Sequence, residues 1–215
     1  MKMKQPTSRA VSIIGILCLC LSCLVSSSCS FLGGPTPRFG IGGSYNEGRE
    51  QFTRGRGGDM DRAVEVLESV VRQDPWYRDS LTLLGRAYYR KGRFRDANQI
   101  LQRALVINKD DEIAWLTLGM TQLRFNDDER AMTTLKGGIT LVSQVAKFGY
   151  RGYPEWDVKG LVRNAISRAG FEIIKGPEAK ENILRACDTL LARMDDEENY
   201  QKNVAPVQFR NDMER

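Results

Sequence analysis

Small and apolar residues recur at a fixed step of 34 positions through the middle of the chain. Three series keep this step, and their members are Ala63, Ala97 and Ala131; Leu67, Leu101 and Leu135; and Gly58, Gly92 and Asn126. Two further pairs follow it, namely Leu84 with Leu118 and Gly85 with Gly119. A fixed period of this length is typical of stacked helical hairpins, each hairpin being one repeat.

The residue types at these positions fit the packing of such hairpins. Gly85 and Gly119 are small because two helices are expected to cross closely there, and the leucines one turn after the alanines fill the shared core. Gly58, Gly92 and Asn126 fall between helices, where a left-handed residue ends the first helix of each hairpin. We therefore predict an all-α solenoid of about three hairpins over residues 44–148.

These repeats resemble the tetratricopeptide repeat (TPR) family. Residues 78–111 carry the motifs LxxLGxxY at 81–88 and AxxxL at 97–101, with Ala104 after them. Residues 112–145 carry WxxLG at 115–119 and AxxxL at 131–135. This second repeat departs from the family pattern at Gln122, where an aromatic residue is expected, and at Gly137 and Gly138, which fall inside its second helix.

An earlier repeat covers residues 44–75, with Ala63, Leu67 and Pro75 at the family positions. Its first helix is displaced in sequence. If Gly48 is its small residue, the hairpin carries three extra residues in the Gly-rich stretch 54–58.

Two more helical patterns follow where the 34-residue step ends, after Gln144. Asp157 can cap the first, and Gly176 and Pro177 separate it from the second, whose apolar face is Ile183, Leu184, Cys187, Leu190, Leu191 and Met194. We expect residues 149–199 to cover the open end of the array. Four acids at 195–198 oppose the helix dipole, so we expect the last helix to fray there and residues 200–215 to form a disordered tail.

The first 28 residues have the pattern of a secretory signal: a basic start, an apolar stretch over 10–25, and small residues before Cys29. The apolar stretch is shorter than the ~20 residues of a membrane-spanning helix. The serines before Cys29 resemble a bacterial lipobox, although Ser26 stands where the family prefers leucine, and Cys23 is a second candidate. The resemblance implies that Cys29 carries palmitate and, with Ser30 after it, an outer-membrane anchor facing the periplasm. A soluble secreted protein is the alternative.

Residues 29–43 are dominated by glycine and proline and are predicted to form a flexible linker between the lipidated cysteine and the array. If Cys29 carries lipid, Cys187 has no partner for an internal disulfide. We expect Cys187 to be a buried core residue rather than a reactive thiol.

Composition narrows the functional classes. The net charge is +5 from 32 basic and 27 acidic residues, but the first 28 residues contribute three basic residues and no acid, which leaves 29 basic and 27 acidic. This near-balance argues against nucleic-acid binding. The chain has no histidine, which excludes histidine-dependent nucleophiles and histidine-ligated metals. We expect no cofactor, no metal and no small-molecule substrate.

TPR arrays use the concave face of their first helices as a peptide groove, and the corresponding stripe here mixes basic and apolar residues. Its predicted members are Tyr45, Arg49, Phe52, Thr82, Arg86, Tyr89, Arg90, Leu116, Met120, Leu123 and Arg124. This mixture suits an acidic or C-terminal peptide with apolar anchors. The alternative for Leu116, Met120 and Leu123 is that they pack under neighbouring helices. The sequence leaves open whether the groove is empty or filled by the protein's own tail.

The resulting hypothesis is a membrane-tethered, non-enzymatic adaptor that binds a protein or peptide on the periplasmic side of the envelope, within an assembly complex. One alternative is a structural lipoprotein that associates with itself. Another is a cell-wall hydrolase, whose candidate acids Glu155, Glu172 and Glu178 lack a supporting polar constellation.

Overall fold

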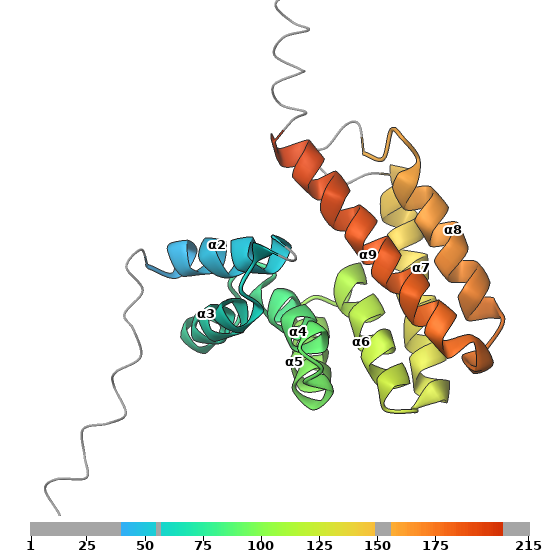
Figure 1. Cartoon of the computed structure of the whole chain (residues 1–215), viewed down its shortest axis with the longest axis horizontal. Coiled ribbons are helices and arrows are strands. Elements are labelled where there is room, and N and C mark those ends of the chain that lie inside the picture. The colour runs from blue at the N-terminus through green and yellow to red at the C-terminus, as the bar shows by residue number, and fades with distance from the viewer. Residues whose placement is uncertain (1–39, 55–56, 149–155, 204–215) are drawn as a thin grey trace, which may run out of the picture. The chain divides into compact units, whose positions relative to one another are not determined.

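The computed structural model describes residues 40–54, 57–148 and 156–203, and this part of the chain is helical with no strand (Figure 1). The elements are α2 (Gly40–Thr53), α3 (Met60–Gln73), α4 (Ser80–Arg90), α5 (Phe94–Ile107), α6 (Glu112–Arg124), α7 (Asp128–Phe148), α8 (Leu161–Ile174), the short 3-10 helix η2 (Pro177–Ala179) and α9 (Lys180–Asn203). The predicted all-α fold of helical hairpins is confirmed. The signal segment 1–28, Cys29 and residues 204–215 lie outside the described residues.

Three hairpins, α2–α3, α4–α5 and α6–α7, form the array, and each crosses at a glycine. A Cβ added at Gly48, Gly85 or Gly119 would lie 2.8, 2.5 or 2.6 Å from the Cγ of the leucine on the paired helix, which is Leu67, Leu101 or Leu135. Those leucines are fully buried. Gly48 therefore holds the position predicted for it, and the first hairpin contains the extra residues expected near 54–58.

The turns inside the hairpins confirm two of three predicted left-handed residues. Gly92 has φ 72° and Asn126 has φ 59°. The prediction for Gly58 is wrong, because its backbone is not in the left-handed region. Glycine is needed there for a different reason: a Cβ would lie 2.1 Å from the carbonyl oxygen of Gln51. Gly58 and Asp59 thus lie against Gln51 at the end of α2, and the Asp59 N–H donates to the Gln51 side chain over 3.0 Å.

Neighbouring hairpins are joined by the same type of polar contact. The residue at the N-cap of each following first helix is an aspartate, Asp79 for α4 and Asp111 for α6. The Tyr45 hydroxyl donates to Asp79, and the Thr82 hydroxyl donates to Asp111 over 2.5 Å. Two residues assigned to the groove from the sequence thus also fix the spacing between repeats.

The array begins earlier than predicted. Residues 40–43 were assigned to the linker, but they are the first turn of α2. Ile41 packs against the core of the first two hairpins, and this burial favours the helix over a free linker despite the glycines. The rest of the linker lies outside the described residues.

Helix α8 begins at Leu161, four positions after the predicted cap residue. Asp157 is fully buried, and its two carboxylate oxygens accept from the backbone N–H groups of Val162 and Arg163, each over 2.9 Å. Its capping role is therefore confirmed, while Gly160 takes the left-handed position directly before the helix. Val158, in the turn before the helix, is exposed.

Helix α9 does not fray at its acidic stretch, contrary to prediction. It continues through residues 195–198 to Asn203. Two of the four acids, Asp195 and Glu198, pair with arginines of other helices, and these pairs outweigh the unfavourable interaction with the helix dipole. The predicted apolar face of α9 is buried in a core with α6, α7 and α8, and Cys187 within it is fully buried as a free thiol. Burial raises the pKa of Cys187 to about 12, helped by the charge of Asp188.

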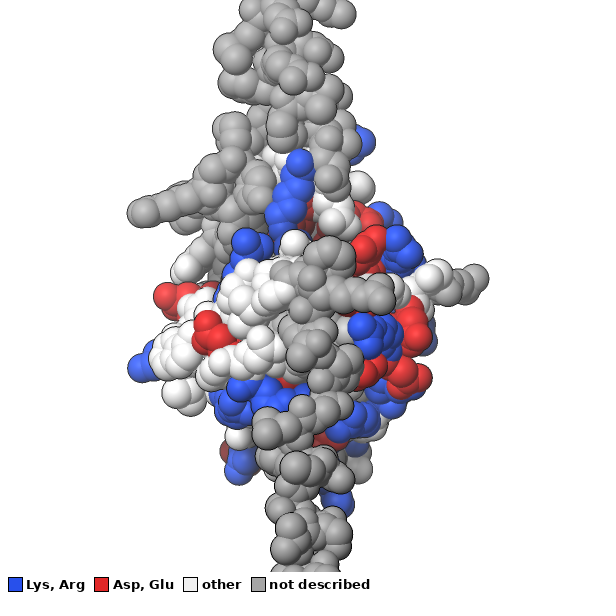
Figure 2. Space-filling model, turned by 90° about the vertical axis from the view of Figure 1, so that its left-hand side faces the viewer, with Lys and Arg blue, Asp and Glu red and all other residues white. Residues whose placement is uncertain are grey.

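None of the described helices combines the length and the apolar character needed to cross a membrane. On the face seen in Figure 2, Lys and Arg side chains are interspersed with Asp and Glu, as the near-balance of charge in the sequence suggests.

Candidate protein-binding groove

Helix α9 packs against α8 and α6, and its acids form ion pairs with the first helix of each of the three hairpins. Near its start, Glu181 contacts Arg124 of α6 at 3.3 Å. Two-thirds of the way along, Asp195 contacts Arg86 of α4, and one turn later Glu198 contacts Arg49 of α2 at 2.8 Å. The C-terminal helix therefore occupies the surface that the sequence predicts as the groove.

The arginines on the first helices follow the repeat. Arg90 and Arg124 are 34 positions apart, and Arg49 and Arg86 hold equivalent places once the three extra residues of the first hairpin are counted. The acids of α9 that pair with them are not evenly spaced. Glu181, Asp195 and Glu198 meet α6, α4 and α2 in turn, and they are 14 and then 3 residues apart.

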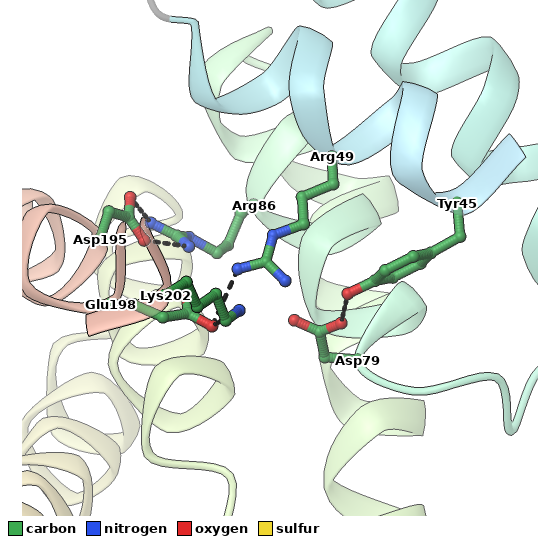
Figure 3. Close-up of polar contacts among 7 residues, drawn as sticks. All are labelled: Tyr45, Arg49, Asp79, Arg86, Asp195, Glu198 and Lys202. Atoms are coloured by element: carbon green, nitrogen blue, oxygen red, sulfur yellow. Dashed lines mark hydrogen bonds and ion pairs between the residues drawn. The ribbon is translucent and has the colours of Figure 1, made fainter. Parts of the chain in front are cut away.

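The pair between Arg86 and Asp195 is the most buried ion pair of this surface (Figure 3). Two parallel contacts join the groups, Nη1 to Oδ1 at 2.9 Å and Nη2 to Oδ2 at 2.7 Å. The exposed fraction is 6% for the Arg86 side chain and 19% for Asp195. A two-point pair in this setting fixes both charge and orientation.

The Phe52 ring packs against the guanidinium groups of Arg86 and Arg90. The ring is fully buried, with the guanidinium carbon of Arg86 4.8 Å and that of Arg90 3.9 Å from the ring centroid. Arg90 also donates to the Phe52 carbonyl over 3.0 Å. Desolvation, followed by the charge of Arg86, lowers the pKa of Arg90. Two guanidinium groups over one ring form a local concentration of positive charge that needs an anionic counterpart.

Glu198 sits between two cations at the far end of α9 (Figure 3). Burial acts to raise its pKa, but the hydrogen bond from Lys202 and the charge of Arg49 outweigh burial and lower it. The Glu198 carboxylate is therefore held in its charged form.

Asp188 lies in the middle of the surface, where the charges of Arg124, Arg90 and Arg86 reach it. Burial dominates over these charges and raises the pKa of Asp188. Beside it, burial raises the pKa of Tyr89 to about 12, and the charge of Asp188 adds to that rise. Asp188 thus faces the arginines at a distance rather than in a tight pair.

Helix α9 does not fill the whole surface. A cleft of about 460 Å³ follows its first half and is lined by residues that include Arg124 and Asp188. A second cleft, of about 450 Å³, follows its last turns and is lined by residues that include Thr53, Met60, Arg90 and Asp195. Arg124 and Arg90 of the array therefore line open clefts beside the first half and the last turns of α9.

The predicted groove residues share this surface but differ in access. Arg49 and Tyr89 are partly buried, while Arg90 and Arg124 are exposed. Phe52, Thr82 and Arg86 are buried. For the three apolar residues the packing alternative holds: Leu116, Met120 and Leu123 are fully buried in one core with residues of α9. Whether a partner binds the remaining residues stays a prediction.

The acids of α9 are the part of the surface that the sequence reading missed. The run of four acids at 195–198, in a chain whose predicted groove carries recurring arginines, was the available signal. The acids proposed for the hydrolase alternative have other settings: Glu172 pairs with Lys175 at 2.9 Å, Glu178 is exposed, and Glu155 lies outside the described residues.

Residues 56–118 match the family model described as tetratricopeptide repeat. The match runs from the end of the first turn through the second hairpin into α6 and supports the assignment of a TPR protein. TPR repeats generally mediate protein–protein interaction, and the family is typically a non-catalytic scaffold. No curated protein matches the chain.

Proposed function

We propose that this protein is a lipid-anchored adaptor of the bacterial cell envelope, in which the TPR array binds a protein partner close to a membrane. The observation that carries the proposal is the seating of α9: arginines from all three hairpins engage the carboxylates of one helix. An array built this way has the shape and charge to hold a helical protein segment. Its chemistry is recognition by charge-assisted hydrogen bonds, without a cofactor.

The anchor is proposed from the sequence. Cys29 precedes the first residue of α2 by 11 positions, and a chain of that length spans at most about 40 Å when fully extended. A multiply acylated Cys29 would therefore keep the array within that distance of the bilayer, and more than one acyl chain makes such an anchor stable. By analogy with bacterial lipoproteins, we place the protein on the periplasmic face of the outer membrane.

Metabolic labelling with radioactive palmitate tests the anchor. The wild-type chain should incorporate label and sediment with membranes, while Cys29→Ala should do neither. Cys23→Ala is the matched control and should behave as wild type. Labelling that persists in Cys29→Ala but disappears in Cys23→Ala would show that Cys23 carries the lipid. Absence of label in all three chains would favour a secreted protein without a lipid anchor.

Charge reversal on the groove tests the binding function. Arg90→Glu/Arg124→Glu changes two exposed arginines that face α9, whereas Arg95→Glu/Arg103→Glu changes two exposed arginines of α5. All three tagged chains are used to capture proteins from envelope extracts. A partner retained by wild type and by the α5 variant, but lost by the groove variant, is the expected result. Equal recovery by all three chains would show that the groove is not the binding surface.

Self-association is a second candidate, favoured by one observation. Phe171 and Ile174 on α8 are large apolar residues with exposed fractions of 61% and 82%. Such an exposed pair on the last hairpin can bury itself against a second copy. Sedimentation of the wild-type chain and Phe171→Ser/Ile174→Ser over a range of concentrations decides it, because only wild type would then gain mass with concentration.

A further inference from the structure

Helix α9 is anchored in two different ways along its length. Its first part is held by apolar residues, which are the six predicted for its face and have exposed fractions of 0–6%: Ile183, Leu184, Cys187, Leu190, Leu191 and Met194. After Met194 the sequence is DDEENYQKN, with no aliphatic residue. We call residues 195–203 the acidic latch.

Asp195 and Glu198 join the acidic latch to the array by ion pairs. Asp195 pairs with Arg86 and lies 3.8 Å from Arg90, and Glu198 pairs with Arg49. On the opposite side, Glu197 accepts from the backbone N–H of Asp157 over 3.0 Å. The Asp195 and Glu198 side chains keep exposed fractions of 19% and 35%, compared with 0–6% for the apolar face of α9. Gln201 of the latch is buried and donates to Glu197 over 2.8 Å. Residues 195–203 contribute no residue to the apolar core, so release of the latch exposes less apolar surface than release of the first part of α9.

The site beneath the acidic latch selects acids one helical turn apart. Arg86 and Arg49 come from adjacent hairpins, and they are met by Asp195 and Glu198, which are three residues apart on one helix face. The fully buried Phe52 ring fixes Arg86 and Arg90, so the positive charges are already in place before a ligand arrives. The cleft beside the latch, lined in part by Thr53 and Met60, leaves room for side chains of an incoming segment.

We infer that the acidic latch is an intramolecular stand-in for the partner: the partner carries an acidic helical segment with carboxylates at positions i and i+3, and this segment displaces residues 195–203 to bind Arg49, Arg86 and Arg90. This inference rests on the proposed adaptor function and specifies the ligand and its control. Binding then requires release of the latch. The apparent affinity for the partner is therefore the affinity of the open form multiplied by the fraction of molecules in which the latch is open.

A helix is favoured over an anionic membrane surface as the occupant. Lipid headgroups offer single charges without a fixed spacing, whereas the Arg86 pair is a planar two-point contact and its neighbour is met one turn later on the same helix. The proximity of a bilayer makes anionic vesicles the necessary competing probe.

Three forms of the intact chain, in detergent micelles, test the inference. They are wild type; Asp195→Ala/Glu198→Ala, which releases the latch; and Asp196→Ala, which removes an exposed acid of the same turn that pairs only with the neighbouring Arg193 in the described contacts. The probe is a fluorescent peptide copying residues 186–203, stapled through positions 189 and 193 so that it is helical. A control peptide has Asn at 195 and Gln at 198. Circular dichroism checks that each chain is folded.

Fluorescence anisotropy should show at least about tenfold tighter binding of the acidic peptide to the latch-released chain than to wild type or Asp196→Ala. The amide peptide should bind all three chains equally weakly. Equal binding of the acidic peptide to all chains, or none to the latch-released chain, overturns the inference. Binding of the latch-released chain to anionic vesicles but not to the peptide overturns it in favour of a lipid surface.

The two proposals fail in different ways. If the peptide is not bound but the Arg90→Glu/Arg124→Glu chain still loses a captured partner, the adaptor function stands and the inferred ligand is wrong. If the peptide binds as expected but no partner depends on the groove, the site exists and the adaptor function is wrong.

Discussion

Replacing Asp195 with alanine leaves the guanidinium of Arg86 buried without its carboxylate. Breaking a fully buried ion pair by removing one partner costs about 3–5 kcal/mol, and an exposed pair contributes only about 0–1 kcal/mol. With exposed fractions of 6% and 19%, this pair lies nearer the buried limit. Arg86 keeps its contact with the Phe52 ring, which offsets part of the loss. We therefore expect Asp195→Ala to lower the free energy of unfolding by about 2 kcal/mol.

Urea denaturation followed by circular dichroism measures this cost. For a dependence of about 2 kcal/mol per molar urea, a loss of ~2 kcal/mol lowers the midpoint by about 1 M. The matched control is Asp196→Ala, whose side chain is 68% exposed and contacts Arg193 at 3.3 Å. Its effect should stay within about 0.5 kcal/mol.

A double-mutant cycle separates the interaction energy of Arg86 with Asp195 from the effect of each substitution on its own helix. Arg86→Met/Asp195→Ala removes both charges, so no ion is left buried alone, and its cost should be smaller than the sum of the two single changes. If Asp195→Ala is no more destabilising than Asp196→Ala, or if the two single changes simply add, the ion pair does not hold α9 in the groove.

Three more predictions concern the helices and their titrating groups. In thermal unfolding, Gly119→Ala should destabilise the protein by about 1–3 kcal/mol, because its Cβ would lie 2.6 Å from Leu135. Gly137→Ala should stabilise the protein by about 0.5–1 kcal/mol, because its Cβ would meet nothing closer than Trp115 at 3.5 Å. If Gly137→Ala were the more destabilising change, the helices would not cross at Gly119. Because folding raises the pKa of Asp188, the stability linked to its neutral form is present at low pH and lost as pH rises through the folded pKa, so Asp188→Asn should be more stable than wild type at pH 7 but not at pH 3 in urea titrations. Cys187 should resist iodoacetamide at pH 8 in the folded chain, since it is fully buried with a pKa raised to about 12, and react once urea unfolds it; rapid labelling of the folded chain would argue against the packing of α9.

The array itself could be predicted because its information is local and repeated. A glycine opposite a leucine at each hairpin crossing, and Gly92 and Asn126 at the turns, act within one hairpin and recur every 34 residues. The prediction for Gly58 is wrong because the first hairpin has a longer turn. The position of Gly58 in the repeat therefore does not imply the same backbone conformation as at Gly92 and Asn126.

The path of α9 could not be predicted from local rules. A helix-dipole argument treats the acids at 195–198 as a local liability, but Asp195 meets Arg86 across 109 positions of sequence. The stripe of groove residues came from the helical period, whereas its occupation depends on how the C-terminal helices return over the array. For the same reason the fully buried Leu116, Met120 and Leu123 could be placed on the correct face without showing that α9 covers them.

Photo-crosslinking inside the cell shows whether a partner binds to the arginine surface under α9. A photoreactive residue is placed at Arg90 in the groove or at Arg103 on α5, each in the wild-type chain and with Asp195→Ala/Glu198→Ala. We expect one adduct from position 90 that strengthens when the acidic latch is released and is absent from position 103. An adduct that forms equally from both positions, or one that weakens on release of the latch, would show that the partner does not bind to this surface.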